Sequence, residues 1–261
     1  MGHVHESNRA FVGDLAADPT DRHAGQTDLS TKLAIVIPTL CEAGNIRELL
    51  ERIKNSLDPL LIPYELVIVD DDSGDGIAAI VEELSSKDPR IRLLIRKNVR
   101  GLAGAIIHGW HNTDAGICGV IDADLQHPPE LLPHLWLTLL SGPDVVVGSR
   151  YSPQSGRPNW SRFRHVVSQL AIWMAWPVQK VGIRVLDPMS GFFLVRRSCI
   201  QAVQLQPEGF KILLEILARG QIQCTAEIPF TFGRRRAGKS KASLRVVIDY
   251  LRLLMRLWKE H

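Results

Sequence analysis

Residues 33–72 read LAIVIPTLCEAGNIRELLERIKNSLDPLLIPYELVIVDDD, and this stretch decides the fold. Its outer parts, residues 33–37 and 66–69, are continuous apolar runs, which predict strands that are buried on both faces. Between them, residues 45–57 carry apolar side chains at helical spacing. Parallel strands need a crossover connection of this length, so the stretch predicts one strand–helix–strand unit of a parallel sheet.

The same alternation continues along the chain. Further strands are predicted at residues 91–95, 118–121 and 145–147, and further helices at 77–84, 101–111 and 128–140. The second half is less regular, with helices predicted at 159–178, 210–219 and 244–258, a strand at 191–195 and an extended segment at 222–232. We therefore predict an α/β, Rossmann-like fold with a mostly parallel sheet flanked by helices.

Bulk composition places the chain among ordinary globular proteins. It has 261 residues, 45% of them hydrophobic and 23% charged, enough to bury a sizeable core. A net charge of +3 is too small to argue for nucleic acid, and no nucleic-acid partner is expected. The four cysteines are far apart and form no C-x-x-C pair, which favours a reducing cytoplasmic compartment: Cys41, Cys118, Cys199 and Cys224.

Three segments are expected. Residues 1–30 are polar and predict a disordered tail without a signal peptide. Residues 31–243 form the main domain, and residues 244–261 an amphipathic terminal helix. No apolar stretch reaches the ~18 residues that a membrane span needs. The apolar stripe of the last helix therefore either packs on the domain or a partner, or lies in a lipid interface; it comprises Leu244, Val247, Ile248, Leu251, Leu254, Met255 and Trp258.

Asp122-Ala123-Asp124, at the end of the fourth predicted strand, is the sharpest chemical signal. Two carboxylates at alternate positions suit Mg²⁺ or Mn²⁺, which bind hard oxygen ligands together with phosphate oxygens. The alternative is a turn whose aspartates cap the next helix. Gln126 and His127 add polar groups and favour the metal site.

Residues 70–76, DDDSGDG, follow the second strand. Asp70 ends a buried strand and could accept hydrogen bonds from a ribose or a base, whereas Asp75 and Gly76 predict a turn and a helix start. No G-x-G-x-x-G follows the first strand, and the chain contains no G-x-S-x-G. A dinucleotide-dependent oxidoreductase and an α/β-hydrolase are disfavoured.

Residues 234–241, RRRAGKSK, hold five cations. Such a segment is either a solvated loop or an anion-binding loop. The second reading would use the ability of arginine to bind phosphate oxygens with two parallel hydrogen bonds.

In this order the motifs resemble those of family 2 glycosyltransferases with a GT-A fold, and within them the dolichol- or polyprenol-phosphate mannose synthases. The matching segments are residues 37–42, 69–76, 101–109, 122–128, 148–151, 187–192 and 232–241. The resemblance covers residues 33–242. Two positions depart from the family pattern: Cys41 stands where Asn is usual, and Ile77 where Thr is usual.

The resemblance implies a role for each matching residue. Those expected to hold the nucleotide sugar are Pro38, Leu40, Glu42, Ile68, Asp70, Asp122, Ala123, Asp124, Gln126, Arg150, Arg235 and Lys241. Asp122, Asp124 and Gln126 would surround Mg²⁺ or Mn²⁺, and Asp124, Arg150 and Arg235 would be catalytic. Arg164, Ser168 and Lys241 would meet the phosphate of the lipid acceptor.

The expected activity is inverting transfer of a sugar, mannose from GDP-mannose, onto dolichyl or polyprenyl phosphate at the cytoplasmic face of a membrane. A first alternative is a family 2 transferase that uses UDP-glucose or another donor, with polyprenyl phosphate or a saccharide as acceptor. A second is a catalytically silent subunit that binds nucleotide sugars. Many relatives carry transmembrane helices after this domain, so either a membrane-anchoring partner or the terminal helix would hold the chain at the membrane.

Overall fold

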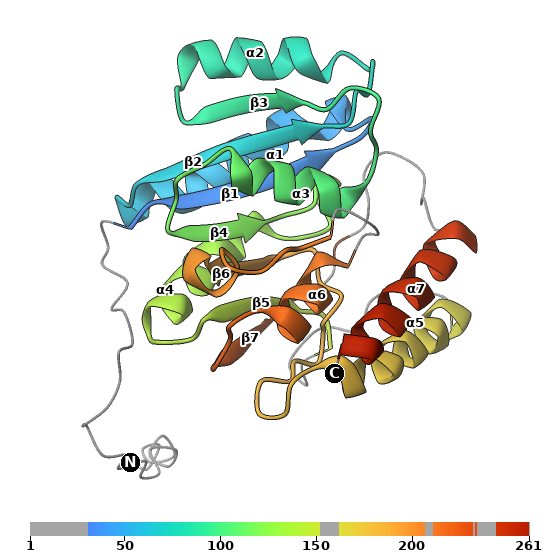
Figure 1. Cartoon of the computed structure of the whole chain (residues 1–261). Coiled ribbons are helices and arrows are strands. Elements are labelled where there is room, and N and C mark those ends of the chain that lie inside the picture. Colours follow the sequence, from blue (N-terminus) through green and yellow to red (C-terminus); the bar gives the residue numbers. More distant parts are fainter. Residues whose placement is uncertain (1–30, 152–161, 207–210, 232, 234–243, 261) are drawn as a thin grey trace, which may run out of the picture.

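The computed structural model describes residues 31–151, 162–206, 211–231, 233 and 244–260. The predicted tail, residues 1–30, and the whole basic segment 234–241 lie outside them. A seven-stranded sheet with order β3-β2-β1-β4-β6-β5-β7 forms the centre of the molecule (Figure 1). Its strands are β1 (Leu33–Thr39), β2 (Tyr64–Asp70), β3 (Ile91–Ile95), β4 (Ile117–Val120), β5 (Val145–Ser149), β6 (Phe193–Arg196) and β7 (Thr225–Pro229).

Helices cover both faces of the sheet (Figure 1). They are α1 (Ala43–Leu57), α2 (Ile77–Lys87), α3 (Leu102–His111), α4 (Leu132–Leu140), α5 (Arg162–Ala175), α6 (Ile212–Arg219) and α7 (Leu244–Glu260), with short 3₁₀ turns η1 (Asp58–Leu60), η2 (Pro129–Leu131), η3 (Trp176–Val178) and η4 (Arg197–Cys199). Alternate residues of β1 point to opposite faces, so Ile35 packs in the core under α1, and Val36 in the core under α3. Gly109 of α3 allows close approach, because a Cβ there would lie 2.7 Å from the methyl carbons of Val36.

The sheet is mostly parallel, as predicted. β1, β2, β3 and β4 pair in parallel, as do β5 and β7, whereas β6 is antiparallel to both β4 and β5. Because β6 is antiparallel to both of its neighbours, β5 runs in the same direction as β4. β7 is parallel to β5 and therefore also runs in that direction. The carboxyl ends of six strands therefore meet at one edge, which is where open α/β sheets bind ligands.

Strand β1 is longer than predicted, since it continues through Pro38 to Thr39. Val36 accepts a hydrogen bond from the backbone N–H of Ile121. The nitrogen of Pro38, two residues later, faces the same side of β1 as the Val36 carbonyl and carries no hydrogen. On that side β4 has already ended at Val120. A proline is tolerated in a strand where no ladder hydrogen bond is needed. The predicted helix at 128–140 differs too: it is the turn η2 followed by α4, with Pro133 in the first turn of α4.

Helix α7 packs on the domain with a different face from the predicted stripe. Its buried residues, Tyr250, Leu253, Leu254 and Leu257, contact α5, η3 and α6. Of the predicted stripe, Leu254 is buried, whereas Val247, Ile248, Leu251, Met255 and Trp258 are 41–58% exposed. Apolar residues thus occupy more of the circumference of α7 than is buried against the domain. Among the described helices, none combines the length and the apolar character that a bilayer span requires.

Candidate active site

Most of the residues predicted from the sequence lie at the carboxyl edge of the sheet. Thr39 at the end of β1 pairs with Asp70 at the end of β2, and Asp122 follows β4, the other neighbour of β1. This arrangement brings together Pro38, Leu40, Glu42, Ile68, Asp70, Asp122, Ala123, Asp124 and Gln126. Arg150 follows β5 at the same edge. Arg235 and Lys241 lie outside the described residues, as does the side chain of Arg164.

The loops after β1 and β2 are bound to each other. Asp70 is 3% exposed, and its carboxylate accepts hydrogen bonds from the hydroxyls of Thr39 and Ser73. Ser73 Oγ in turn accepts from the backbone N–H of Cys41 at 2.8 Å. Asp75 accepts from Ala43 N and Ile77 N, at the starts of α1 and α2, so the predicted helix start at Asp75 is confirmed. The carboxylate of Asp70 therefore lies at the carboxyl edge of the sheet and also holds the loop after β2 in its conformation.

Backbone geometry explains the departure at Cys41. Its φ is +60°, in the left-handed region that Asn adopts more readily than other side chains. The asparagine usual in the family suits this conformation, and a cysteine adopts it at a cost of about 1 kcal/mol. The Cys41 backbone is nevertheless held in place by Ser73.

Segment 122–126 turns sharply at Leu125, whose φ is also +60°. The turn brings the backbone N–H of Gln126 to 3.1 Å from Asp124 Oδ1. Asp124 is 7% exposed, and the side chain of Asp122 is 33% exposed. Gly191 makes room for Asp122, because a Cβ at position 191 would lie 2.5 Å from its Oδ2. The two carboxylates are thus fixed from several sides at the end of β4.

These residues fit a hard divalent cation. Within the described part of the chain, no three His, Cys, Asp or Glu side chains are grouped as a closed metal site. Mg²⁺ does not require one, since it is commonly held by one or two carboxylates together with substrate phosphates and water. Asp122 and Asp124, with the amide of Gln126, supply such an oxygen donor set.

Gln126 also connects this motif to the basic segment. Its Nε2 donates to the carbonyl of Gly233 at 3.1 Å, and the Gly233 N–H donates to the Gln126 carbonyl at 2.9 Å. Residues 234–241 begin immediately after Gly233. A contact across 107 positions of sequence therefore places Gly233, the residue before the five-cation segment, beside the two-carboxylate motif.

The ring of His127 packs between aromatic side chains next to Asp122. The ring is 2% exposed and lies between Phe192 and Phe230, with centroid separations of 5.6 and 5.5 Å. Burial lowers the pKa of His127 to about 4, so the ring is neutral at physiological pH. Its Nδ1 lies 3.6 Å from Asp122 Oδ2.

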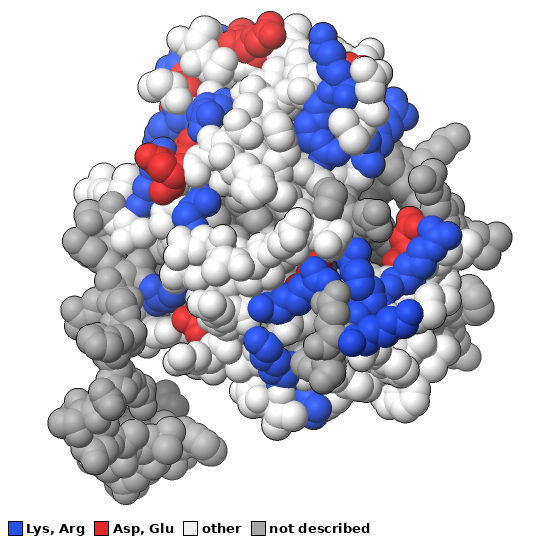
Figure 2. Space-filling view, in the orientation of Figure 1, with Lys and Arg blue, Asp and Glu red and all other residues white. Residues whose placement is uncertain are grey.

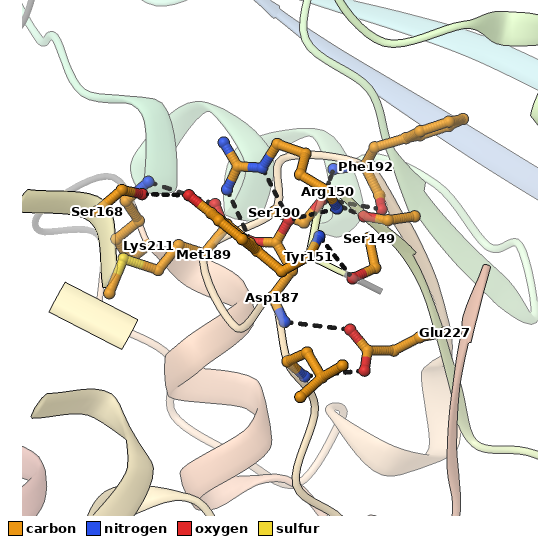
Figure 3. Close-up of polar contacts among 12 residues, drawn as sticks. Ser149, Arg150, Tyr151, Ser168, Asp187, Met189, Ser190, Phe192, Lys211 and Glu227 are labelled. Carbon is orange, nitrogen blue, oxygen red and sulfur yellow. Dashed lines mark hydrogen bonds and ion pairs between the residues drawn. The ribbon is translucent and has the colours of Figure 1, made fainter. Parts of the chain in front are cut away.

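Arg150 is held by a pair of ionic hydrogen bonds (Figure 3). Its Nε and Nη2 each lie 2.7 Å from an oxygen of Asp187, which also accepts from the Arg150 backbone N–H. Glu227 fixes the loop on the other side by accepting from the backbone N–H groups of Leu186 and Asp187. Burial raises the pKa of Glu227. The guanidinium is therefore prepositioned at the end of β5.

Lys211 is a cation that the sequence analysis missed. It precedes α6, and its Nζ donates to the carbonyl of Met189 at 3.3 Å. Burial, and then the nearby charge of Arg150, lower the pKa of Lys211 to about 8. The available signal was a single lysine inside the apolar run 210–214, FKILL.

Comparisons with known proteins identify the family. The model of "Glycosyl transferase family 2" matches residues 34–203. A dolichol-phosphate mannosyltransferase of Pyrococcus furiosus is 42% identical over 229 residues, which are 87% of this chain and 64% of the relative. The dolichol-phosphate mannosyltransferase of Saccharomyces cerevisiae is 35% identical over 240 residues, 88% of each chain. This chain thus spans less than two thirds of the length of the archaeal relative.

A solved structure supports the fold. Glucosyl-3-phosphoglycerate synthase from Mycobacterium tuberculosis, in complex with Mn²⁺, UDP-glucose and phosphoglyceric acid, superposes with a TM-score of 0.59. The match covers 92% of this chain and 86% of that protein, at 20% identity. The GT-A type fold predicted from the motifs is confirmed. From its matched residues and its mannosyltransferase relatives, the chain belongs to glycosyl transferase family 2.

Proposed function

We propose that this chain transfers mannose from GDP-mannose onto dolichyl or another polyprenyl phosphate, with inversion at the sugar carbon. The names of the two relatives suggest the sugar and the acceptor. The observation that carries the proposal is the contact of Gln126 with Gly233, which joins a donor-binding motif to a cationic segment. Two phosphorylated substrates can approach each other only if cations offset their mutual repulsion.

On the donor side, the nucleotide would lie along the ends of β2, β1 and β4. Pro38, Leu40, Glu42, Ile68 and Asp70 would contact it from the first two strands, with Asp122 and Ala123 from the third. Asp122, Asp124 and Gln126 would hold Mg²⁺ or Mn²⁺, and the bound cation would neutralise charge on the diphosphate. The manganese in the mycobacterial structure is consistent with this donor set.

On the acceptor side, no general base is required, because a phosphate monoester is already anionic at neutral pH. A phosphate oxygen would form the new bond to the sugar C1 as the bond from C1 to the diphosphate breaks on the opposite side. Arg150, Arg235 and Lys241 would meet phosphate oxygens, and Arg164 and Ser168 would help to hold the lipid phosphate. Catalysis would come from positioning and from fixed charges.

A membrane surface is the proposed location of the reaction, at its cytoplasmic side. Seven apolar residues of α5 and α7 are exposed and are here called the apolar face: Leu170, Trp173, Val247, Ile248, Leu251, Met255 and Trp258. Beside Trp173 and Trp258, an apolar cleft of about 450 Å³ opens between α5, η3 and α7. Lys and Arg side chains gather over α6 and α7 (Figure 2). Tryptophans and cations together are typical of surfaces that dock in the lipid interface.

The proposal is tested with a donor panel. The full chain is incubated with polyprenyl phosphate in vesicles and with radiolabelled GDP-mannose, UDP-glucose or GDP-glucose, and lipid-extracted product is counted with Mg²⁺, Mn²⁺ or EDTA. We expect product from GDP-mannose with a divalent cation. Product from another donor alone, or on a saccharide hydroxyl alone, would replace the proposal. Nucleotide-sugar binding without transfer or hydrolysis of any donor would indicate a silent binding subunit.

A further inference from the structure

An enclosed histidine lies directly behind the two-carboxylate motif. His127 follows Asp124 by three positions and is 2% exposed. The proposed metal and nucleotide contacts use Asp122, Asp124 and Gln126 but not this ring. An apolar side chain would fill the same space at a lower cost in desolvation, so the presence of an imidazole here calls for an explanation.

Two phenylalanines fix the orientation of the imidazole. Phe192 precedes β6 and Phe230 follows β7, and their ring centres lie 6.1 Å apart with an angle of 84° between the ring planes. The His127 ring packs against both. Both phenylalanines are bound to the end of β5, because Gly148 N donates to the Phe192 carbonyl at 2.9 Å and Phe230 N to the Ser149 carbonyl at 3.1 Å. A rotation of the imidazole would disturb these contacts, so its nitrogens keep fixed directions.

The fixed orientation brings Nδ1 of His127 to 3.6 Å from Oδ2 of Asp122. A neutral imidazole carries a proton on one nitrogen and a lone pair on the other. A lone pair on Nδ1 would be repelled by the carboxylate oxygen, so the tautomer with the proton on Nδ1 is favoured. A contact shorter by about 0.6 Å would be an ordinary N–H···O hydrogen bond.

Gly191 confines the same carboxylate from another side. A Cβ at position 191 would lie 2.5 Å from Oδ2 and 2.8 Å from Oδ1 of Asp122. A neutral donor suits the remaining side, because it orients the carboxylate without cancelling its charge. A lysine or arginine in place of His127 would compete with a metal ion for that charge. Hydrogen bonds of this kind to metal-binding side chains set their orientation and raise the affinity for the metal.

We propose that His127 is a positioning residue for the carboxylate of Asp122, an inference that rests on the metal site of the proposed function. The Nδ1–H group donates to Oδ2, so the carboxylate meets Mg²⁺ or Mn²⁺ in one orientation. Packing against Phe192 and Phe230 makes the donor rigid. Because the ring is enclosed, His127 acts through Asp122 and not on the nucleotide.

The test replaces the two ring nitrogens one at a time. An asparagine amide reaches the place of Nδ1, a glutamine amide reaches that of Nε2, and phenylalanine keeps a ring without a donor. Mn²⁺ affinity is measured by electron paramagnetic resonance in the presence of GDP. We expect the Kd for Mn²⁺ to rise about tenfold or more in His127→Phe and His127→Gln, the scale of losing such a partner, and less in His127→Asn. The Kd for GDP in EDTA should stay as in wild type.

Urea unfolding separates positioning from packing. His127→Phe keeps an aromatic ring in the cluster and should unfold at the same urea concentration as wild type or a higher one. His127→Asn leaves part of the space empty and should unfold at a lower concentration. The two variants thus rank in opposite order for stability and for Mn²⁺ affinity, which a merely structural role would not produce. His134→Asn changes an exposed histidine of α4 and should alter neither property.

An unchanged Kd for Mn²⁺ in His127→Phe, rescue by glutamine instead of asparagine, or affinity that falls in step with stability overturns the inference. If His127→Asn does not fold, a double variant decides. When Asp122 is already alanine, His127→Phe should weaken Mn²⁺ binding no further, and an additive loss would contradict action through Asp122.

The outcome is distinguishable from failure of the proposed function. Wild type that binds no Mn²⁺ with GDP would reject the metal site together with the role of His127. No acceptor takes part in these measurements, so a failure to transfer sugar to polyprenyl phosphate would reject the proposed acceptor and leave this result unchanged.

Discussion

Arg150 and Asp187 form a bidentate ion pair inside the protein, although 37 positions separate them in the sequence. Asp187 is fully buried, and the side chain of Arg150 is only 13% exposed. A pair in this position does not by itself stabilise a fold strongly, since removing two charges from water is costly. Its effect is to hold a guanidinium in one orientation beside the proposed phosphate sites.

Removal of Asp187 should therefore destabilise the protein strongly. Asp187→Ala leaves Arg150 buried without its carboxylate, and we expect the free energy of unfolding to fall by about 3–5 kcal/mol. Urea unfolding followed by circular dichroism measures the change. The double variant Arg150→Met with Asp187→Leu should recover most of this loss while remaining inactive. A loss below about 1 kcal/mol in Asp187→Ala would show that the guanidinium finds other partners.

Metal-dependent donor binding should depend on Asp124 and on the space at Gly191. Asp124→Ala should abolish transfer and weaken Mn²⁺ binding, measured by electron paramagnetic resonance in the presence of GDP. Gly191→Ala should weaken Mn²⁺ binding as well, because its methyl group would displace the carboxylate of Asp122.

Gly44→Ala is the matched control, since nothing lies within 4 Å of a Cβ at that position. It should leave Mn²⁺ binding and transfer unchanged. Transfer in EDTA equal to that in Mn²⁺ or Mg²⁺ would contradict a metal role for Asp122 and Asp124.

Within the basic segment, individual cations should differ in importance. Arg235→Ala and Lys241→Ala should lower kcat/KM by about a hundredfold, the scale of losing one group that stabilises developing charge. Arg234→Ala should have a smaller effect, because it does not match a phosphate-binding position. Initial rates with GDP-mannose and polyprenyl phosphate measure all three. Equal and mild effects would indicate that the segment is a solvated surface.

The four thiols should fall into two reactivity classes. Burial raises the pKa of Cys118 to about 12 and that of Cys199 to about 11, so both stay protonated at pH 8. Cys41 and Cys224 are exposed. A thiol reagent such as DTNB should label two cysteines quickly and the other two only on unfolding.

Nucleotide binding should change this labelling at one position. Cys41 lies in the loop after β1, so GDP-mannose with Mg²⁺ should slow its reaction. Cys224 immediately precedes the amino end of β7, away from the carboxyl edge of the sheet, and should react as before. Cys41→Ser identifies which thiol is protected. Equal protection of both cysteines, or of neither, would contradict a nucleotide site at the end of β1.

Membrane docking should depend on the apolar face. Wild type should float with vesicles that contain phosphatidylserine, whereas Leu251→Glu with Trp258→Glu should stay in the soluble fraction. Both residues are exposed, so the double variant should keep its unfolding transition and its affinity for GDP. Leu61→Glu changes an apolar residue outside the apolar face that is more exposed still, at 92%, and should float like wild type. Unfolding of the double variant would show instead that these side chains belong to the core.

The strands and the carboxyl edge of the sheet could be predicted because a strand buried on both faces requires a continuous run of apolar residues in the local sequence. Residues 33–37 and 66–69 are apolar throughout, since strands covered by helices on both faces exclude polar side chains. The motifs at 70–76 and 122–128 follow such strands directly, so their place at the carboxyl edge follows from topology alone. The two-carboxylate motif could be located in the same way.

Contacts between distant segments required the tertiary structure. Three such contacts are the antiparallel insertion of β6, the contact of Gln126 with Gly233 and the pairing of Arg150 with Asp187. In each of them, the local sequence around one residue does not indicate which distant residue it contacts. The packing of α7 shows the same limit, because its apolar residues extend over more than one face. Periodicity determines that a helix has an apolar side, whereas only the shape of the domain beneath decides which residues are buried and which, like Trp258, remain exposed.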